Sequence, residues 1–134
     1  MGRKETWTLK ITIPAGQAAN STLNVKIIRD PRTGEEDYIQ MVQTFYVHDV
    51  YVLSSPSIDC ILIFEKNDTR VVAKTPPLSA LDVTKTNRPF PFGKDTVLGY
   101  ESLAKLTIKA INLEANSGTA DVEVTAYMEV EIEE

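Results

Sequence analysis

The residues best suited to chemistry lie between positions 48 and 57. His48 is the single histidine of the chain, Asp49 follows it, and serines occur at positions 54, 55 and 57. A serine, a histidine and a carboxylate that converge in space form a nucleophilic triad. Successive side chains of a strand point to opposite faces, however, which would separate His48 from Asp49. We therefore interpret this pair as polar residues at a bulge or sheet edge and expect no enzymatic activity.

A second candidate nucleophile is Cys60. A cysteine attacks as a thiolate, so it needs surroundings that lower the pKa of its thiol. Cys60 alternates in phase with Ile58, Leu62 and Phe64. That pattern is typical of a small buried hydrophobic residue, and we expect Cys60 to be structural.

Two acidic clusters could attract cations. The turn at 30–37 carries Asp30, Glu35, Glu36 and Asp37, and carboxylate oxygens are the ligands that calcium prefers. The spacing is not that of an EF-hand loop, and Arg29 and Arg32 supply opposite charge, so we favour a solvated turn. The second cluster, Glu129, Glu131, Glu133 and Glu134, fits outward acids that keep a strand edge from pairing with neighbours. We expect no metal and no cofactor.

The segment 75–102 differs from the rest because prolines, glycines and aromatic residues gather there. Proline cannot donate to a β-ladder, so this excursion should lie outside the central strands. Its aromatic residues either cover one end of the sheet or anchor a partner, since such residues are enriched at interface cores. The residues predicted to form an interface are Phe90, Pro91, Phe92 and Tyr100.

Strict alternation of apolar and polar residues dominates the remaining chain. From Ala120 to Glu133, valine, alanine, methionine and isoleucine alternate with charged or polar residues, which predicts a strand with one buried face. The run at 105–110 has the same form. We predict that residues 103–133 form a β-hairpin whose loop is 112–118. Lys105 and Lys109 would then lie opposite the glutamates at 123, 129 and 131.

Further strands are predicted at 6–13, 23–27, 38–53, 58–65 and 69–74. The longest of these should bend at a bulge near His48-Asp49 or divide into two strands. The strand at 58–65 is apolar on both faces and should lie centrally. One helical turn is expected near 78–83 and a short strand near 96–98. The result is one all-β domain, 1–134, an antiparallel two-sheet sandwich with roughly seven or eight strands, no substantial helix, and jelly-roll or immunoglobulin-like topology.

Length and charge limit the classes of function. The chain has 134 residues and a formal net charge of −5, so nucleic acid and anionic membranes are poor partners. One cysteine excludes an intramolecular disulfide. The N-terminal residues show no apolar stretch of signal-peptide length, and no run is long enough to span a bilayer. We expect a protein made or assembled in the cytoplasm.

The pattern running from Leu106-Thr107-Ile108-Lys109-Ala110 to Val122-Glu123-Val124-Thr125-Ala126-Tyr127, after a long proline-rich excursion, resembles single jelly-roll capsid and capsid-decorating proteins of virus particles. The resemblance implies a virion component, assembled in the host cytoplasm, that forms a homo-oligomer, with a trimer favoured, and packs on a capsid shell. The alternative is a carbohydrate-binding or other ligand-binding module with exposed aromatic rings. Tyr127 fits that role, whereas Trp7 is in phase with core residues.

Overall fold

The computed structural model of the chain describes residues 2–85, 89–91 and 98–134. Within these residues the fold is all-β, and the one helical element is a short 3-10 turn, η1, at Leu78–Leu81. The strands are β1 (Arg3–Ile13), β2 (Thr22–Ile28), β3 (Ile39–Gln40), β4 (Phe45–Tyr51), β5 (Cys60–Lys66), β6 (Arg70–Lys74), β7 (Phe90–Pro91), β8 (Leu98–Tyr100), β9 (Lys105–Asn112) and β10 (Val122–Ile132).

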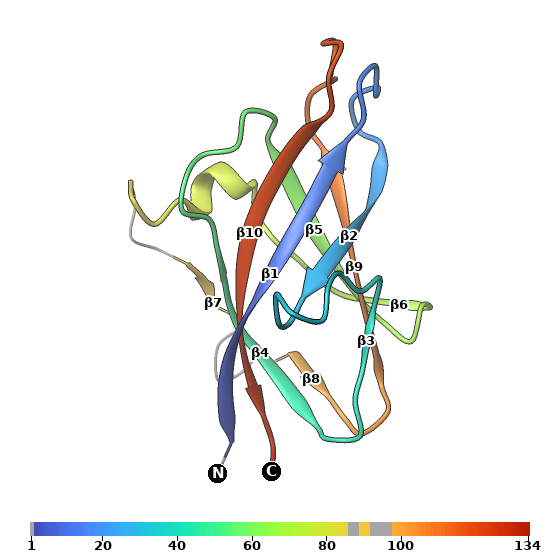
Figure 1. Cartoon of the computed structure of the whole chain (residues 1–134), viewed down its shortest axis with the longest axis vertical. Coiled ribbons are helices and arrows are strands. Elements are labelled where there is room, and N and C mark those ends of the chain that lie inside the picture. Colours follow the sequence, from blue (N-terminus) through green and yellow to red (C-terminus); the bar gives the residue numbers. More distant parts are fainter. Residues whose placement is uncertain (1, 86–88, 92–97) are drawn as a thin grey trace.

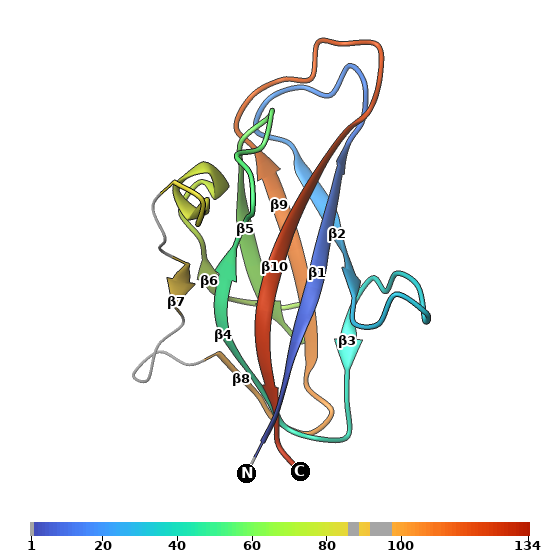
Figure 2. The same ribbon diagram turned by 60° about the vertical axis from the view of Figure 1, so that its left-hand side comes forward.

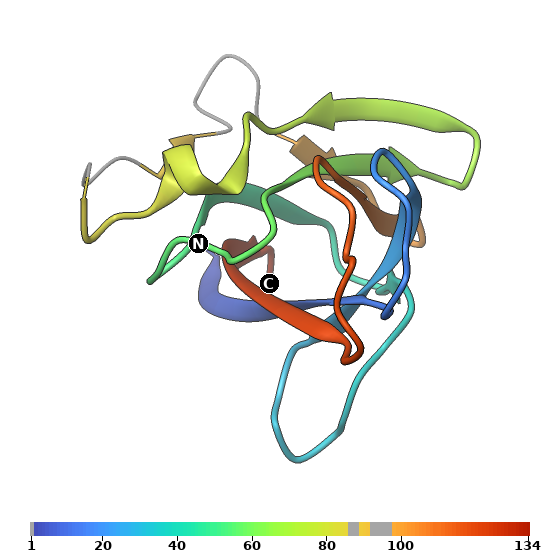
Figure 3. The same ribbon diagram turned by 90° about the horizontal axis from the view of Figure 1, so that it is seen from above.

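The strands form one antiparallel sheet that is nearly closed into a barrel (Figures 1 and 3). Along the sheet the order is β6-β5-β9-β2-β1-β10-β4-β7, with β3 added to β9 and β8 added to β4. The first half of β2 pairs with β9 and the second half with β1, so β2 carries the sheet around one side. Opposite β2, the Lys66 side chain donates to the Gly99 carbonyl and joins the β5 and β8 sides.

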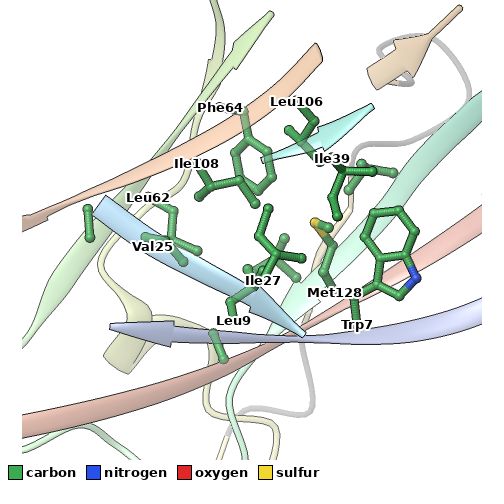
Figure 4. Close-up of a cluster of buried hydrophobic side chains, with 14 of the residues drawn as sticks. Trp7, Leu9, Val25, Ile27, Ile39, Leu62, Phe64, Leu106, Ile108 and Met128 are labelled. Atoms are coloured by element: carbon green, nitrogen blue, oxygen red, sulfur yellow. The ribbon is translucent and has the colours of Figure 1, made fainter. Parts of the chain in front are cut away.

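Inward side chains of all the long strands meet in one core. Figure 4 shows Trp7, Leu9 and Met128 from one side of the barrel facing Phe64, Leu106 and Ile108 from the other. Toward the end where the chain termini lie, Phe45 stacks on Tyr100 with 5.0 Å between ring centroids, and the Trp7 ring lies 5.5 Å from Phe45. Aromatic rings bury a large area each, so this group stabilises the barrel where its strands are shortest.

The alternating segment at the end of the chain is a strand, as predicted. Residues at even positions from Val124 to Ile132 are buried, while Glu123, Thr125 and the later odd positions face outward. The predicted hairpin is wrong, because β10 does not pair with β9. It pairs with β1 over eleven positions, from Arg3 opposite Ile132 to Ile13 opposite Val122, and with β4 on its other side.

The reason for this pairing lies in the loops at one end of the barrel (Figure 2). Asn116 is buried, and its side-chain nitrogen donates to the carbonyls of Ile13, Pro14 and Ala120 at 3.0–3.1 Å. Its backbone also exchanges hydrogen bonds with Gly16 and Gln17. The loop after β9 is therefore fastened to the loop after β1, and it delivers β10 to β1.

The predicted charge pairs across the hairpin are absent for the same reason. Lys105 instead pairs with Asp68 at 2.6 Å and Lys109 with Glu65 at 3.4 Å, both on the β5–β6 side. Glu123 lies 3.5 Å from Lys10 of β1. Two predictions about single elements are confirmed. The helical turn is present as η1, and β5 has a paired neighbour on each side. No helix in the described ranges is long and apolar enough to cross a membrane.

Candidate functional site

The outer face of β4 and β10 carries a row of three glutamates that we call the glutamate ladder: Glu129, Glu131 and Glu133. Each is met by a side chain from β4. The Tyr51 hydroxyl donates to Glu129 at 3.0 Å, the His48 Nε2 lies 3.0 Å from a Glu131 oxygen, and the Tyr46 hydroxyl donates to Glu133 at 3.3 Å. The cross-strand register of an antiparallel pair brings these side chains together.

A β-bulge determines which side chains reach this face. Asp49 pairs with Glu129 and Val47 with Val130, so His48 is the extra residue in β4. The bulge was predicted, but the inference that His48 and Asp49 point to opposite faces was wrong. Val47 and Val50 are both buried, and the two polar residues between them both face outward. An extra residue in a strand interrupts the alternation, and this is its expected consequence.

His48 and Asp49 line a hollow of about 280 Å³ together with Lys4, Glu129 and Val130. The nearby serine at position 55 does not join them, because its hydroxyl donates to Asp82 at 2.8 Å. Asp82 is itself buried, and hydrogen bonds from Thr84 and Ser55 lower the pKa of its carboxyl. The described residues thus give Ser55 and His48 different acidic partners and form no serine–histidine–aspartate triad.

The ladder differs electrostatically from the other acidic positions of the sheet. Glu65, Asp68 and Glu101 each form a salt bridge with a lysine. In the described part of the chain, Glu129 and Glu133 accept hydrogen bonds from hydroxyl groups but have no lysine or arginine partner. Burial, followed by the hydrogen bond to Glu129, raises the pKa of Tyr51 to about 12. Its phenol therefore remains a donor throughout the neutral range.

Cys60 is fully buried at the start of β5, as expected of a structural cysteine. Its Sγ lies 3.6 Å from the Ile58 carbonyl. Burial raises the pKa of the thiol to about 11, so the reactive thiolate is disfavoured at neutral pH.

The acidic turn at 30–37 distributes its carboxylates among separate basic partners. Asp30 accepts hydrogen bonds from the backbone and side chain of Arg32, which lower the pKa of its carboxyl. Glu35 pairs with Lys10, and Asp37 pairs with Lys26. Within the described ranges, no group of three or more histidines, cysteines and acids is placed to hold a metal ion.

The four residues predicted as an interface have different surroundings. Phe90 is half-buried against the core and Pro91 is exposed, and together they form β7 at the edge of the sheet beside β4. Phe92 lies outside the described residues. Tyr100 is fully buried, stacked on Phe45, and its hydroxyl donates to the Glu65 carbonyl at 3.3 Å. Its side chain therefore has no surface to offer a partner, and the interface prediction for Tyr100 does not fit this position.

A set of exposed apolar residues at the end of the barrel near the termini was not predicted. We call it the apolar rim: Val42 and Leu103, with 75% and 60% of their surface exposed. The amide of Leu103 donates to the Met41 carbonyl at 2.8 Å, so the segments that carry Val42 and Leu103 adjoin. Leu103 had been assigned to a strand, and its alternation gave no sign that it lies in a turn.

No model of a protein family matches the chain, and a search of curated proteins found no significant match.

Proposed function

We propose that the protein is a non-enzymatic structural or assembly protein that acts by self-association, and specifically a virion component such as a capsid or capsid-decorating protein. The observation that carries the proposal is the exposed, left-handed conformation of Leu103. Its backbone has φ of 67°, a left-handed conformation that a leucine adopts only at a cost, and this conformation holds an apolar side chain in solvent. A second subunit covering that side chain would offset both costs.

Three hydrogen bonds stabilise the unusual conformation. Besides the bond from Leu103 to Met41, the Gln40 side chain donates to the Leu103 carbonyl at 2.8 Å, and the Ala104 amide donates to the Glu101 carbonyl at 2.9 Å. The leucine is thus presented by a braced turn. Contiguous exposed apolar residues mark interaction sites more often than scattered ones do. In this proposal the rim, and separately Phe90 and Pro91 of β7, meet another copy or a capsid shell.

The grouping of the strands supports a jelly-roll-like arrangement as the finer description. β5 pairs with both β6 and β9 on one side, β10 pairs with both β1 and β4 on the other, and β2 joins the two sides. Jelly-roll subunits, which build many virus capsids, have two groups of strands packed face to face. A trimer assembled in the host cytoplasm is the oligomer we favour.

The proposal is tested by light scattering of the purified protein across a range of concentrations, with wild type compared to Leu103→Asn. Asparagine tolerates a left-handed backbone better than leucine, so the monomer should keep its fold while the apolar contact is lost. We expect an oligomer for wild type and an apparent dissociation constant raised at least about tenfold in the variant.

Leu53→Asn is the matched control, because Leu53 is 52% exposed on the loop after β4 and lies outside the rim. It should leave the oligomer intact. A wild-type protein that remains monomeric at every concentration, with or without a capsid shell, would refute self-association.

A second candidate function is binding of a carbohydrate. It is favoured by the Tyr51 and Tyr127 rings, which stack at 5.6 Å on the outer face beside the glutamate ladder, where carboxylates could accept hydrogen bonds from sugar hydroxyls. Trp7 is buried and contributes nothing to it. A glycan array in which wild type binds and Tyr127→Ala does not would support this function, and an array without a signal would reject it.

A further inference from the structure

A second hollow lies on the opposite side of β1 from the ladder. It measures about 480 Å³ and is lined by Glu5, Thr6, Arg29, Asp30, Pro31 and Thr33. It forms where β2 ends. The last pair between the two strands is Thr8 with Ile28, and the chain then turns away through Arg29 into the loop that ends near Asp37 (Figures 1 and 2).

Because β2 ends there, β1 continues alone on that side. Arg3 to Trp7 pair with β10 along one edge, and among the described residues no strand pairs with their other edge. Alternate residues of such a segment present backbone N–H and C=O groups without a ladder partner. An open edge of this kind is a template for an added strand.

The hollow is lined by one base, Arg29, and by two acids, Glu5 and Asp30, that are bonded to other groups. Glu5 accepts hydrogen bonds from the Trp7 indole at 2.9 Å and from Arg3 at 3.0 Å, and Asp30 is held by Arg32. Arg29 forms no salt bridge with any described residue, and its Nε is buried without a hydrogen-bond partner. Buried donors of native proteins nearly always have a hydrogen-bond acceptor, so we expect this nitrogen to bind an acceptor that the described residues do not supply.

The guanidinium is also held in place. Its Cζ lies 5.3 Å from the centre of the Trp7 ring, and Trp7 is fully buried. A cation over the face of a tryptophan is attracted by the ring and loses much of its freedom. An arginine restrained in this way can pair with a carboxylate through two parallel hydrogen bonds at a small entropic cost.

From these two features we infer that the hollow is a binding site for an extended acidic peptide segment of a partner protein, whose backbone adds to the open edge of β1 and whose carboxylate pairs with Arg29. The inference combines an anchor for a negative charge with an edge that accepts main-chain hydrogen bonds. It does not depend on self-association, because it involves none of the rim residues.

The first experiment uses wild-type protein and two synthetic nine-residue peptides of alternating valine and threonine, one with a central glutamate and one with a central glutamine. Binding is followed by the fluorescence of Trp7, the single tryptophan of the chain, and by amide chemical shifts. We expect the glutamate peptide to bind at least about tenfold more tightly and to shift the amides of residues 3–7. Equal affinity for the two peptides, or shifts confined to other strands, would overturn the inference.

The second experiment changes the protein. Arg29→Met retains an apolar stem over Trp7 but removes the charge, and it should weaken binding of the glutamate peptide by about tenfold or more. Arg70→Met is the matched control, since Arg70 is exposed at the start of β6 and does not line the hollow, and it should change affinity less than about twofold. Unchanged binding by Arg29→Met would overturn the inference.

Sodium acetate, titrated alone, separates a peptide site from a site for any small anion. We expect acetate to bind far more weakly than the glutamate peptide and to leave the amides of residues 3–7 unshifted. Acetate that matches the peptide in affinity would show that the edge of β1 takes no part, which would also overturn the inference.

Discussion

The two sides of the barrel treat their outward acids in opposite ways. On the β5–β9 side, Glu65 and Asp68 each face a lysine of β9. On the β4–β10 side, the glutamate ladder is met by tyrosines and a histidine, and Asp49 lies directly opposite Glu129 in the register. The first side pairs its acids with lysines of the same chain, whereas the second orients its carboxylates without neutralising them with lysine or arginine.

This difference shows that alternation alone does not determine the electrostatic character of a face. β9 and β10 have the same alternating pattern of buried and outward residues. The two sides differ in whether the neighbouring strand supplies lysines or phenols, and this depends on the order of strands in the sheet. Glu129 and Glu133 on the β4–β10 side consequently form no salt bridge with a described lysine or arginine, and the β5–β9 side gains small contributions to stability from its ion pairs.

The largest effect is expected from breaking the pair between Glu65 and Lys109. The Glu65 side chain is only 16% exposed, so Lys109→Met leaves a nearly buried carboxylate without its cation. The free energy of unfolding should fall by about 1–3 kcal/mol, measured by urea denaturation at pH 7. Lys10→Met is the control, because its partners Glu35 and Glu123 are well exposed, and it should change stability by less than about 0.5 kcal/mol. Equal losses would contradict the contrast.

An intermediate effect is expected on the ladder side at alkaline pH. The pKa of Tyr51 is raised from 10 to about 12 in the folded state, so the fold favours the protonated phenol. That contribution is complete below pH 10 and is lost as pH rises toward 12. Tyr51→Phe should be less stable than wild type by about 0.5–1.5 kcal/mol at pH 7 and should lose less stability between pH 10 and 12.

Thermal unfolding at several pH values measures both quantities. The Tyr51→Phe variant should still lose some stability at alkaline pH, because burial raises the pKa of the Tyr100 phenol as well. Parallel stability curves for Tyr51→Phe and wild type above pH 10 would show that the phenol of Tyr51 is not restrained by Glu129.

The smallest effect on stability is expected from neutralising one acid on each side. Its sign should differ between the two sides. Asp49→Asn relieves the repulsion with Glu129 and should raise stability by about 0.2–1 kcal/mol. Asp68→Asn should lower stability, because Lys105 and Thr107 hydrogen-bond that carboxylate and lower its pKa. The gain at Asp49 should vanish in about 1 M sodium chloride, where charges on the surface are screened. A loss of stability in Asp49→Asn would mean that its carboxylate is compensated.

The sequence predicted which face of a strand is buried, but not which strands pair with each other. Alternation identifies the buried side of β10 because a strand has a period of two, and every even position from Val124 onward is indeed buried. It carries no information on which strand lies alongside. One contact that favours the observed pairing comes from Asn116, which looks like an ordinary turn residue in the sequence but links two loops from a buried position.

The candidate sites were less predictable for related reasons. The bulge near His48 was foreseen, yet its effect on Asp49 depends on how the extra residue is accommodated opposite Glu129. Leu103 looks like a strand residue because nothing in its neighbours announces a left-handed turn. The hollow beside Arg29 exists because β2 stops five residues short of the start of β1, and strand ends are the least predictable feature of a sequence.

The long pairing of β1 with β10 also has a mechanical consequence. Arg3 lies opposite Ile132, and the two ends of the chain leave the barrel side by side (Figure 1). A force that pulls these ends apart acts across the ladder rather than along it, so hydrogen bonds yield one pair after another instead of all at once. The protein should therefore resist traction on its termini weakly.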